Sequence, residues 1–313
     1  MAVSLGFLLL LFYLMRDDFP EILRVLKNIN RPLFLTAISM SLVNIVILAR
    51  RLQIIFGAEG VGVKLTEASN LTFIGFFFNN FLPTSVGGDL VKALCASRVT
   101  REPVKSVTSV LMDRIFGLFT FIVIPSVSFL FFLKEIQNPS VPVMIYSFLA
   151  FAVFCFFLLF DRAMAKRFRF IEKLLNVFHL GEKVKKIYEG LHAFRHRRLV
   201  MVQAMALSIA GQCLGIVVLY LTSLSMGVRT SILYFFLLVP VVHLLSMLPS
   251  LNGLGIREGA YIYFLSPYLG REYAAALSVL YLLTLFLFSV IGGLIYLFRH
   301  DYHIRFKEAA VSS

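Results

Sequence analysis

The sequence has no tryptophan, only three cysteines in 313 residues, and only 15% charged residues. The cysteines, Cys95, Cys155 and Cys213, show no Cys-x-x-Cys spacing and lie in apolar surroundings, so they are interpreted as small packing residues rather than a disulfide or metal set. Long polar stretches are also scarce, since 59% of the residues are hydrophobic and the mean hydropathy is +0.86. Soluble domains do not have this composition, so we predict a polytopic helical membrane protein.

Several catalytic signatures are missing as well. The segment 86–92 contains a Gly pair and a lysine but lacks the Gly-Lys-Ser/Thr ending of a phosphate loop. No Ser-His-Asp or paired-carboxylate set lies outside the predicted membrane segments, and there is no Asp-x-Asp motif. His192 and His196 have i,i+4 spacing but lack the third ligand and the glutamate of a zinc-hydrolase helix. The sequence therefore predicts no cofactor and no metal site.

The formal net charge is +13, and the basic residues lie mostly in connecting segments. This distribution is typical of cytoplasmic loops that face anionic lipid. The densest basic segment, 161–198, also has apolar residues at helical spacing, which predicts two basic amphipathic helices on the cytoplasmic membrane surface. Nucleic-acid binding is the other interpretation of a basic chain, but no soluble domain is present to carry it.

Two similar breaks interrupt apolar segments, at residues 82–89 and 248–258. Each begins with Leu-Pro, continues with a small hydroxyl residue and glycines, and ends in charge. Proline and glycine end one helix and allow another to begin. Unwound backbone at membrane depth is tolerated only beside protein or a wet cavity. Two such breaks in corresponding places are a pointer to a transporter-like binding site.

Apolar runs predict the remaining organisation. Residues 1–15 are short for a membrane span, and 17–30 have the periodicity of an interfacial amphipathic helix. Predicted spans are 32–49 (stopped by Arg50-Arg51), 104–133, 141–160, 199–224 and 273–298, and the shorter helices flanking the breaks are 65–81, 90–97, 232–248 and 256–265.

Orientation follows from the positive-inside rule, with 161–198 and the C-terminal tail placed in the cytoplasm. The first broken hairpin then enters from the inside and the second from the outside. We therefore predict an all-α transmembrane bundle in the cell membrane: one integral membrane domain, 1–313, with an inverted-topology repeat and two re-entrant broken hairpins. The first repeat is 32–133, the connecting span is 141–160, and the inverted second repeat is 199–298. Residues 16–31 are placed outside despite four basic residues, which goes against the rule.

The hairpin tips are expected to approach each other near the membrane midplane. They would bring Asp89 and Lys92 together with Arg257 and Glu258, and charges at that depth usually mark function. The amide ends of the short helices favour an anion such as phosphate, and Arg257 offers a planar fork for it. In the alternative interpretation, the two acids are helix caps and Arg257 pairs with one of them. The candidate headgroup-binding residues are Asn80, Pro83, Gly87, Gly88, Asp89, Lys92, Asp113, Arg114, Pro249, Gly253, Gly255, Arg257 and Glu258.

Three further groups have two interpretations each. Asp113-Arg114 could line the cytoplasmic mouth of a pathway or form a local ion pair near the interface. Asn79 and Asn80 could hydrogen-bond the opened backbone or act as ordinary helix-end caps. His243 could relay protons, but a hydrogen-bonded packing histidine is the favoured interpretation.

The ordered pattern of these residues resembles the lysylphosphatidylglycerol synthase transmembrane-region family, over roughly 30–300. The pattern is Asn80-x-x-Leu-Pro-x-x-x-Gly-Gly-Asp89, then Asp113-Arg114, then Leu-Pro-x-x-x-Gly-x-Gly-Ile-Arg257-Glu258-Gly259. The resemblance implies a flippase-like protein. In the best-known member, the membrane part is implicated in moving aminoacylated phosphatidylglycerol between leaflets, and a separate soluble domain transfers the amino acid from tRNA. Lys92 departs from the family pattern, where arginine is expected, and loses bidentate phosphate geometry.

Only about fifteen residues follow the last predicted span, so the resemblance implies the lipid-handling part and argues against the aminoacyl transferase. The first hypothesis is a lipid translocase for a phosphate-bearing or aminoacylated headgroup, with phospholipid or polyprenyl-phosphate lipid as the partner. The second is a membrane transferase that modifies a lipid headgroup, with Asp89 or Glu258 as base. The third is a non-catalytic subunit of a lipid synthase that uses 161–198, a segment also expected to contact anionic lipid. A homo-oligomer is a further expectation.

Overall fold

The computed structural model describes residues 19–82, 87–132, 190–192, 194–247 and 253–303, with a few positions between 143 and 154. Every regular element in these ranges is helical. Within these ranges, four helices are long and apolar enough to cross a membrane: α3 (Arg31–Ala58), α6 (Pro103–Phe129, continued by the 3-10 turn η1, Leu130–Phe132), α11 (Arg198–Ser225) and α14 (Arg271–Phe298). The predicted all-α polytopic bundle is therefore confirmed.

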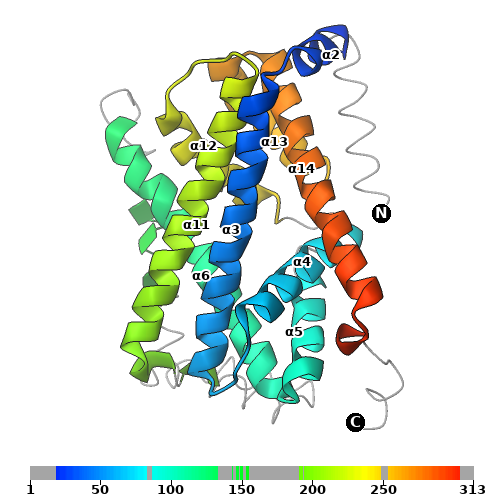
Figure 1. The fold of residues 1–313 in the computed structure, drawn as a ribbon. Coiled ribbons are helices and arrows are strands. Elements are labelled where there is room, and N and C mark those ends of the chain that lie inside the picture. Colours follow the sequence, from blue (N-terminus) through cyan, green and yellow to red (C-terminus); the bar gives the residue numbers. More distant parts are fainter. Residues whose placement is uncertain are drawn as a thin grey trace, which may run out of the picture.

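Two helical hairpins complete the bundle. The first joins α4 (Leu65–Phe81) to α5 (Gly87–Thr100), and the second joins α12 (Ile232–Leu245) to α13 (Ile256–Leu269). Figure 1 shows α4 and α5 at one end of the molecule and α12 and α13 at the other, whereas α3 and α11 run its full length. The helices of each hairpin end at the Leu-Pro and glycine segments because proline and glycine interrupt regular helix. The hairpins are thus half-length and open at opposite ends of the bundle.

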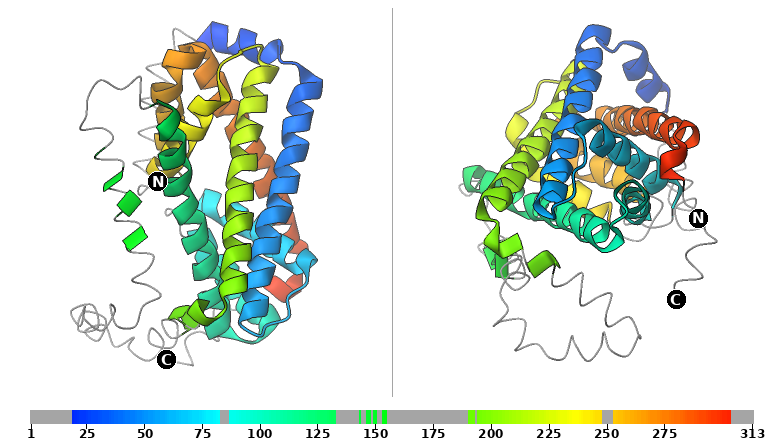
Figure 2. Two further views of the ribbon diagram at one scale, coloured as in Figure 1. Left: turned by 90° about the vertical axis from the view of Figure 1, so that its left-hand side faces the viewer. Right: turned by 60° about the horizontal axis from the view of Figure 1, so that its bottom comes forward.

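Most helix contacts pair up when α3, α4, α5 and α6 are matched with α11, α12, α13 and α14, although the contact of α6 with α11 has no comparable counterpart between α14 and α3. α3 packs against α11, its own counterpart. α14 packs against α4, and the corresponding pair, α6 and α12, is also in contact. The same correspondence relates the contacts of α5 with α6 to those of α13 with α14. Each long outer helix therefore supports the hairpin of the other half, and Figure 2 shows α6 running the length of the molecule beside α11.

The segments that precede each half obey the same relation. α2 (Phe19–Lys27) places Ile22 in the apolar cluster formed by α12, α13 and α14. The segment before α11, which includes the 3-10 turn η2 (Phe194–His196), places Leu191 and Phe194 against Met112 and Phe116 of α6. The predicted amphipathic helix near the N-terminus therefore has a protein partner for its apolar face.

At each end of the molecule, segments that the predicted topology places on the same side of the membrane lie together. At one end, the 3-10 turn η3 (His300–Tyr302) docks on α5: Cys95 donates its S–H to the Tyr302 carbonyl at 3.2 Å, and Tyr302 is only 2% exposed. At the other end, the Asn30 N–H donates to the Ser225 carbonyl at 2.7 Å. The turn after α5 and the segment after α14, which the charge rule places on one side, thus lie at one end.

Glycines allow two very close backbone approaches. A Cβ at Gly292 of α14 would lie 2.0 Å from the Phe73 carbonyl oxygen of α4, and a Cβ at Gly88 of α5 would lie 2.3 Å from the Gly75 carbonyl oxygen of α4. Neither distance is possible for a real side chain. The backbone of α4 therefore packs directly against the backbones of α5 and α14, with almost no side chains between them.

Several boundaries differ from the sequence prediction. α3 does not end at Arg50-Arg51 but continues to Ala58, since Arg51 is buried and paired inside the bundle. α5 begins at Gly87 and ends at Thr100 rather than covering 90–97, α12 ends at Leu245 rather than 248, and α13 extends to Leu269. The predictions for 1–15 and 161–189, and most of 141–160, lie outside the described residues, and the domain boundaries stay predictions.

Candidate functional site

A cavity of about 230 Å³ lies between α3, the first hairpin, α6 and α11. Its lining combines apolar side chains with an unusual number of charges. Five ionisable residues contribute to it: Arg51, Asp89, Lys92, Asp113 and Arg114. Four of these were predicted as site residues from the sequence, and the fold brings all four to one place.

The five charges form a continuous chain of ion pairs. Arg51 Nε donates to Asp113 Oδ1 at 2.7 Å, and Lys92 Nζ reaches Asp113 Oδ2 at 3.2 Å. Lys92 Nζ also lies 3.4 Å from Asp89 Oδ1, and Arg114 Nη1 lies 3.3 Å from Asp89 Oδ2. Each carboxylate therefore sits between two cations, with an arginine at each end of the chain. Three cations against two carboxylates leave a net charge of +1 beside the cavity.

Local helix geometry positions these groups. Asp89 and Lys92 share one face of α5 because residues three apart are neighbours on a helix. Asp113 and Arg114 lie in the middle of α6, and Arg51 extends from α3, where its Nη1 also donates to Ser208 of α11 at 2.9 Å. Gly117 of α6 lies beside that guanidinium, and a Cβ there would be in ordinary contact with Arg51 Nη1 at 3.7 Å.

The cavity lining also holds buried polar atoms with spare hydrogen-bonding capacity. Arg114 Nε, Gln212 Nε2 and Asn44 Oδ1 are buried and have no hydrogen-bond partner within the described parts of the chain. A buried donor without an acceptor is costly, so an acceptor entering the cavity would be favoured. Arg114 Nε and Gln212 Nε2 are donors; Asn44 Oδ1 is an acceptor, as is Asp89 Oδ2, a fourth such atom, which lies 3.3 Å from Arg114 Nη1.

An asparagine hydrogen-bonds the backbone next to the first break. Asn79 Oδ1 accepts the Gly88 N–H at 2.9 Å, which satisfies an amide in the first turn of α5. This contact fits both interpretations of Asn79, because the amide beside the break is also a first-turn amide of a helix. Gly87 and Gly88 are buried at this helix start, Asn80 lies in the last turn of α4, and Pro83 lies outside the described residues.

The second hairpin carries a different cluster. Arg257 Nη2 donates to Glu258 Oε1 at 2.8 Å, and Glu258 Oε2 accepts the Gly255 N–H at 2.6 Å. Both side chains are buried, with Arg257 4% and Glu258 3% exposed. Gly255 has φ +84° and Gly253 has φ +76°, a backbone conformation that favours glycine. This matches the interpretation of Glu258 as a helix cap paired with Arg257, and Pro249 lies outside the described residues.

Aromatic and histidine side chains surround this second pair. The Arg257 guanidinium lies 5.6 Å from the centre of the Tyr281 ring. His243 Nε2 is 3.1 Å from the Tyr261 hydroxyl, which fits a hydrogen-bonded packing histidine. The Phe121 ring lies 5.5 Å from the His243 ring and also lines the cavity. Phe121 therefore stands between the two clusters.

The predicted single midplane site is thus two clusters. Asp89, Lys92, Asp113 and Arg114 line the cavity, whereas Arg257 and Glu258 pair within the second hairpin. Sequence reasoning missed Arg51, which was interpreted as a span terminator. The available signal was the apolar run that continues after it, from Leu52 to Phe56. Asn44, Ser208 and Gln212, which also line the cavity, had no distinguishing sequence signal.

The comparisons with known proteins agree with this architecture. Residues 1–293 match the model of the lysylphosphatidylglycerol synthase TM region, a match that includes both breaks and both clusters. No curated protein matches the chain, and no solved structure matches it. With 293 of 313 residues matched, the chain belongs to the lysylphosphatidylglycerol synthase TM region family.

Proposed function

We propose that this membrane protein is a lipid translocase whose cavity binds the phosphate of a lipid headgroup. Family membership supports a role connected with lipid headgroups. The observation that carries the proposal is the ion-pair chain that ends in arginines and leaves one positive charge beside the cavity. Charges at membrane depth are costly and are retained where they bind a substrate or ion.

The ligand favoured by this geometry is an anion with several acceptor oxygens. Arg114 is the best-placed cation, because its side chain is 26% exposed and its Nε has no hydrogen-bond partner within the described parts of the chain. A guanidinium presents planar donors that match a phosphate. Gln212 Nε2 would supply a further donor from α11.

The cavity has the size of a headgroup rather than of a whole lipid. Its volume of about 230 Å³ equals that of about eight water molecules at roughly 30 Å³ each. The acyl chains would therefore stay in the bilayer while the headgroup enters. Because each outer helix packs on the hairpin of the other half, a rocking movement of the halves would open the cavity alternately to the two sides.

The test is headgroup translocation in proteoliposomes, measured as transbilayer movement of phosphatidylglycerol. We expect Arg114→Gln to slow movement at least about tenfold, since a charge-assisted hydrogen bond contributes about 1.5–3 kcal/mol. Arg50→Gln is the matched control: Arg50 is an exposed arginine next to Arg51, and it donates to Gln53 at 2.6 Å. This control should move lipid like the intact protein.

Two outcomes would contradict the proposal. One is no movement by the intact protein for any of several anionic and aminoacylated lipids. The other is equal rates in the Arg114→Gln variant and the intact protein at matched folded yield. Appearance of a modified headgroup with purified protein would instead identify the membrane transferase among the earlier hypotheses.

A further inference from the structure

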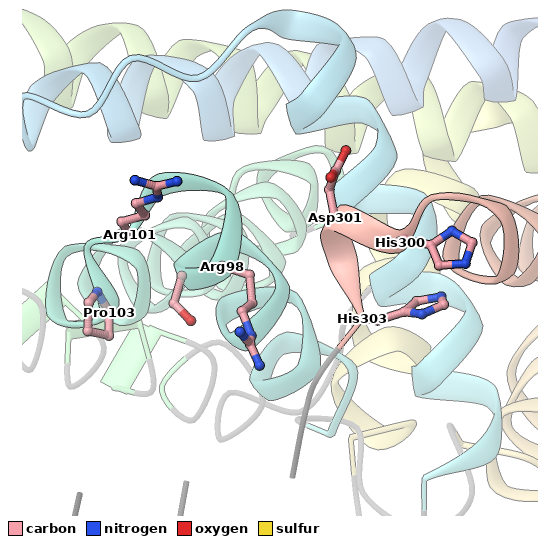
Figure 3. Close-up of a pocket in the computed structure, with 7 residues that line it drawn as sticks. Arg98, Arg101, Pro103, His300, Asp301 and His303 are labelled. Carbon is pink, nitrogen blue, oxygen red and sulfur yellow. The ribbon is translucent and has the colours of Figure 1, made fainter. Parts of the chain in front are cut away.

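A second, larger cavity lies at the end of the molecule where η3 meets the turn between α5 and α6. Its volume is about 530 Å³, and it is separate from the lining of the first cavity. Figure 3 shows Arg98 and Arg101 on the α5 side, and His300, Asp301 and His303 on the η3 side. Neither the family pattern nor the proposed translocation uses these residues.

The lining is predominantly basic. The lining holds two arginines, two histidines and one aspartate, so basic side chains outnumber acidic ones. Guanidinium N–H groups are donors, so the two arginines suit an anion with several oxygens, such as phosphate.

Both walls of this cavity are held by contacts that need no ligand. On the α5 side, Arg101 adopts φ +59°, a left-handed conformation that is unusual for arginine. The adjacent Thr100 hydroxyl accepts the Glu102 N–H at 3.2 Å and lies 2.9 Å from the Ser106 hydroxyl. On the η3 side, His303 Nε2 lies 2.7 Å from the Tyr296 carbonyl oxygen. The arginines and histidines are thus carried on ordered segments.

The two walls belong to different halves of the bundle. Arg98 and Arg101 come from the end of α5 in the first half, and η3 directly follows α14 of the second half. A ligand that contacts both walls would join the halves at this end. It would do so in a cavity that shares no lining residue with the one beside the Arg51–Arg114 ion-pair chain.

We propose that this cavity is a second anion site, which takes a phosphate group and ties the two halves together at this end. The phosphate could belong to an anionic lipid headgroup or to a free phosphorylated solute, because both present the same oxygens. The site does not depend on translocation. We therefore expect phosphate to stabilise the folded protein even in variants that lack the cations of the central cavity.

The test is thermal unfolding of the purified chain in detergent, titrated with inorganic phosphate at constant ionic strength set by chloride. The double variant Arg98→Gln/Arg101→Asn removes both cations, and asparagine tolerates the left-handed backbone at 101. We expect its apparent phosphate affinity to fall at least about tenfold, as expected for lost charge-assisted contacts. Lys105→Gln is the matched control, since Lys105 lies near the same turn, pairs with Glu102 at 3.2 Å and does not line the cavity.

A second variant is expected to strengthen phosphate binding. Asp301→Asn removes the carboxylate from an exposed position, so phosphate should bind a few-fold more tightly without a loss of folding. Nanodiscs that contain phosphatidylglycerol or only phosphatidylcholine separate the two sources. Stabilisation by phosphatidylglycerol but not by inorganic phosphate identifies a headgroup, and the reverse identifies a free solute.

Three results would overturn this site. They are wild-type phosphate affinity in both Arg98→Gln/Arg101→Asn and Asp301→Asn, a phosphate response abolished by Arg114→Gln alone, or no stabilisation by either probe. The translocation proposal stands or falls separately, since its test measures lipid movement after a change in the central cavity.

Discussion

At the start of α5, Asp89 and Lys92 reach charged residues on α3 and α6 beside a cavity. At the start of α13, Arg257 and Glu258 are adjacent in sequence, pair with each other and lie against Tyr281. The same backbone break thus supports an extended ion chain in one half and a self-neutralised pair in the other. Within the described residues the extended chain has an excess cation and the second pair does not, so the comparison separates a site suited to a ligand from one suited to holding a helix start.

The largest effect is expected where the extended chain is cut in its middle. Asp113 is 6% exposed and accepts from both Arg51 and Lys92, so Asp113→Asn leaves two buried cations without their shared carboxylate. Breaking a buried pair by removing one partner costs about 3–5 kcal/mol. We expect thermal unfolding of the purified variant in detergent to show a loss in this range.

Two companion variants sharpen this result. Glu102, the N-cap residue of α6, has a half-exposed carboxylate that pairs with Lys105. Glu102→Gln removes this carboxylate and should cost no more than about 1 kcal/mol of folding stability. Adding Lys92→Met to Asp113→Asn should recover part of the loss, because one unpaired cation is removed. Equal unfolding of Asp113→Asn and the intact protein would show that the ion chain does not stabilise the fold.

A smaller effect is expected in the second cluster. Glu258→Gln leaves one buried cation, Arg257, rather than two, while glutamine can still cap the Gly255 N–H. The expected cost is about 3 kcal/mol, at the lower end for a broken buried pair. Translocation per folded molecule should fall less than in Arg114→Gln. If Glu258→Gln abolishes transport while folding is intact, the second cluster contacts the substrate and the contrast between the hairpins fails.

The smallest effect concerns the amide at the first break. Asn79→Ala removes the acceptor of the Gly88 N–H, and a lost cap of this kind costs about 1 kcal/mol. Asn79→Asp keeps an acceptor and places negative charge near the start of α5, so it should be milder. The same unfolding measurement compares them, and an alanine variant as stable as the aspartate variant would remove the capping role.

Much of the fold could be predicted because membrane spans and breaks are local signals. Apolar runs gave the long helices, and Pro83 and Pro249 gave the hairpin breaks. The pairing of charges is not local. The prediction that Asp89 and Lys92 meet Arg257 and Glu258 used depth in the membrane alone, and equal depth does not fix lateral separation.

Arg50 and Arg51 show that the burial of a single residue could not be predicted from the sequence. As a pair they match the signal for the end of a span, and Arg50 is indeed exposed. Successive residues on a helix point about 100° apart, so Arg51 faces α6 and α11 instead. Which of two adjacent arginines is buried depends on helix packing, which the sequence does not state.

The crossing of α14 over α4 has a mechanical consequence. With Gly292 lying directly against the Phe73 carbonyl, no layer of side chains separates the two backbones. Sliding either helix along the other would bring a larger residue onto that carbonyl. Any relative movement of α4 and α14 that keeps this contact is therefore a rotation about it, with Gly292 as the pivot.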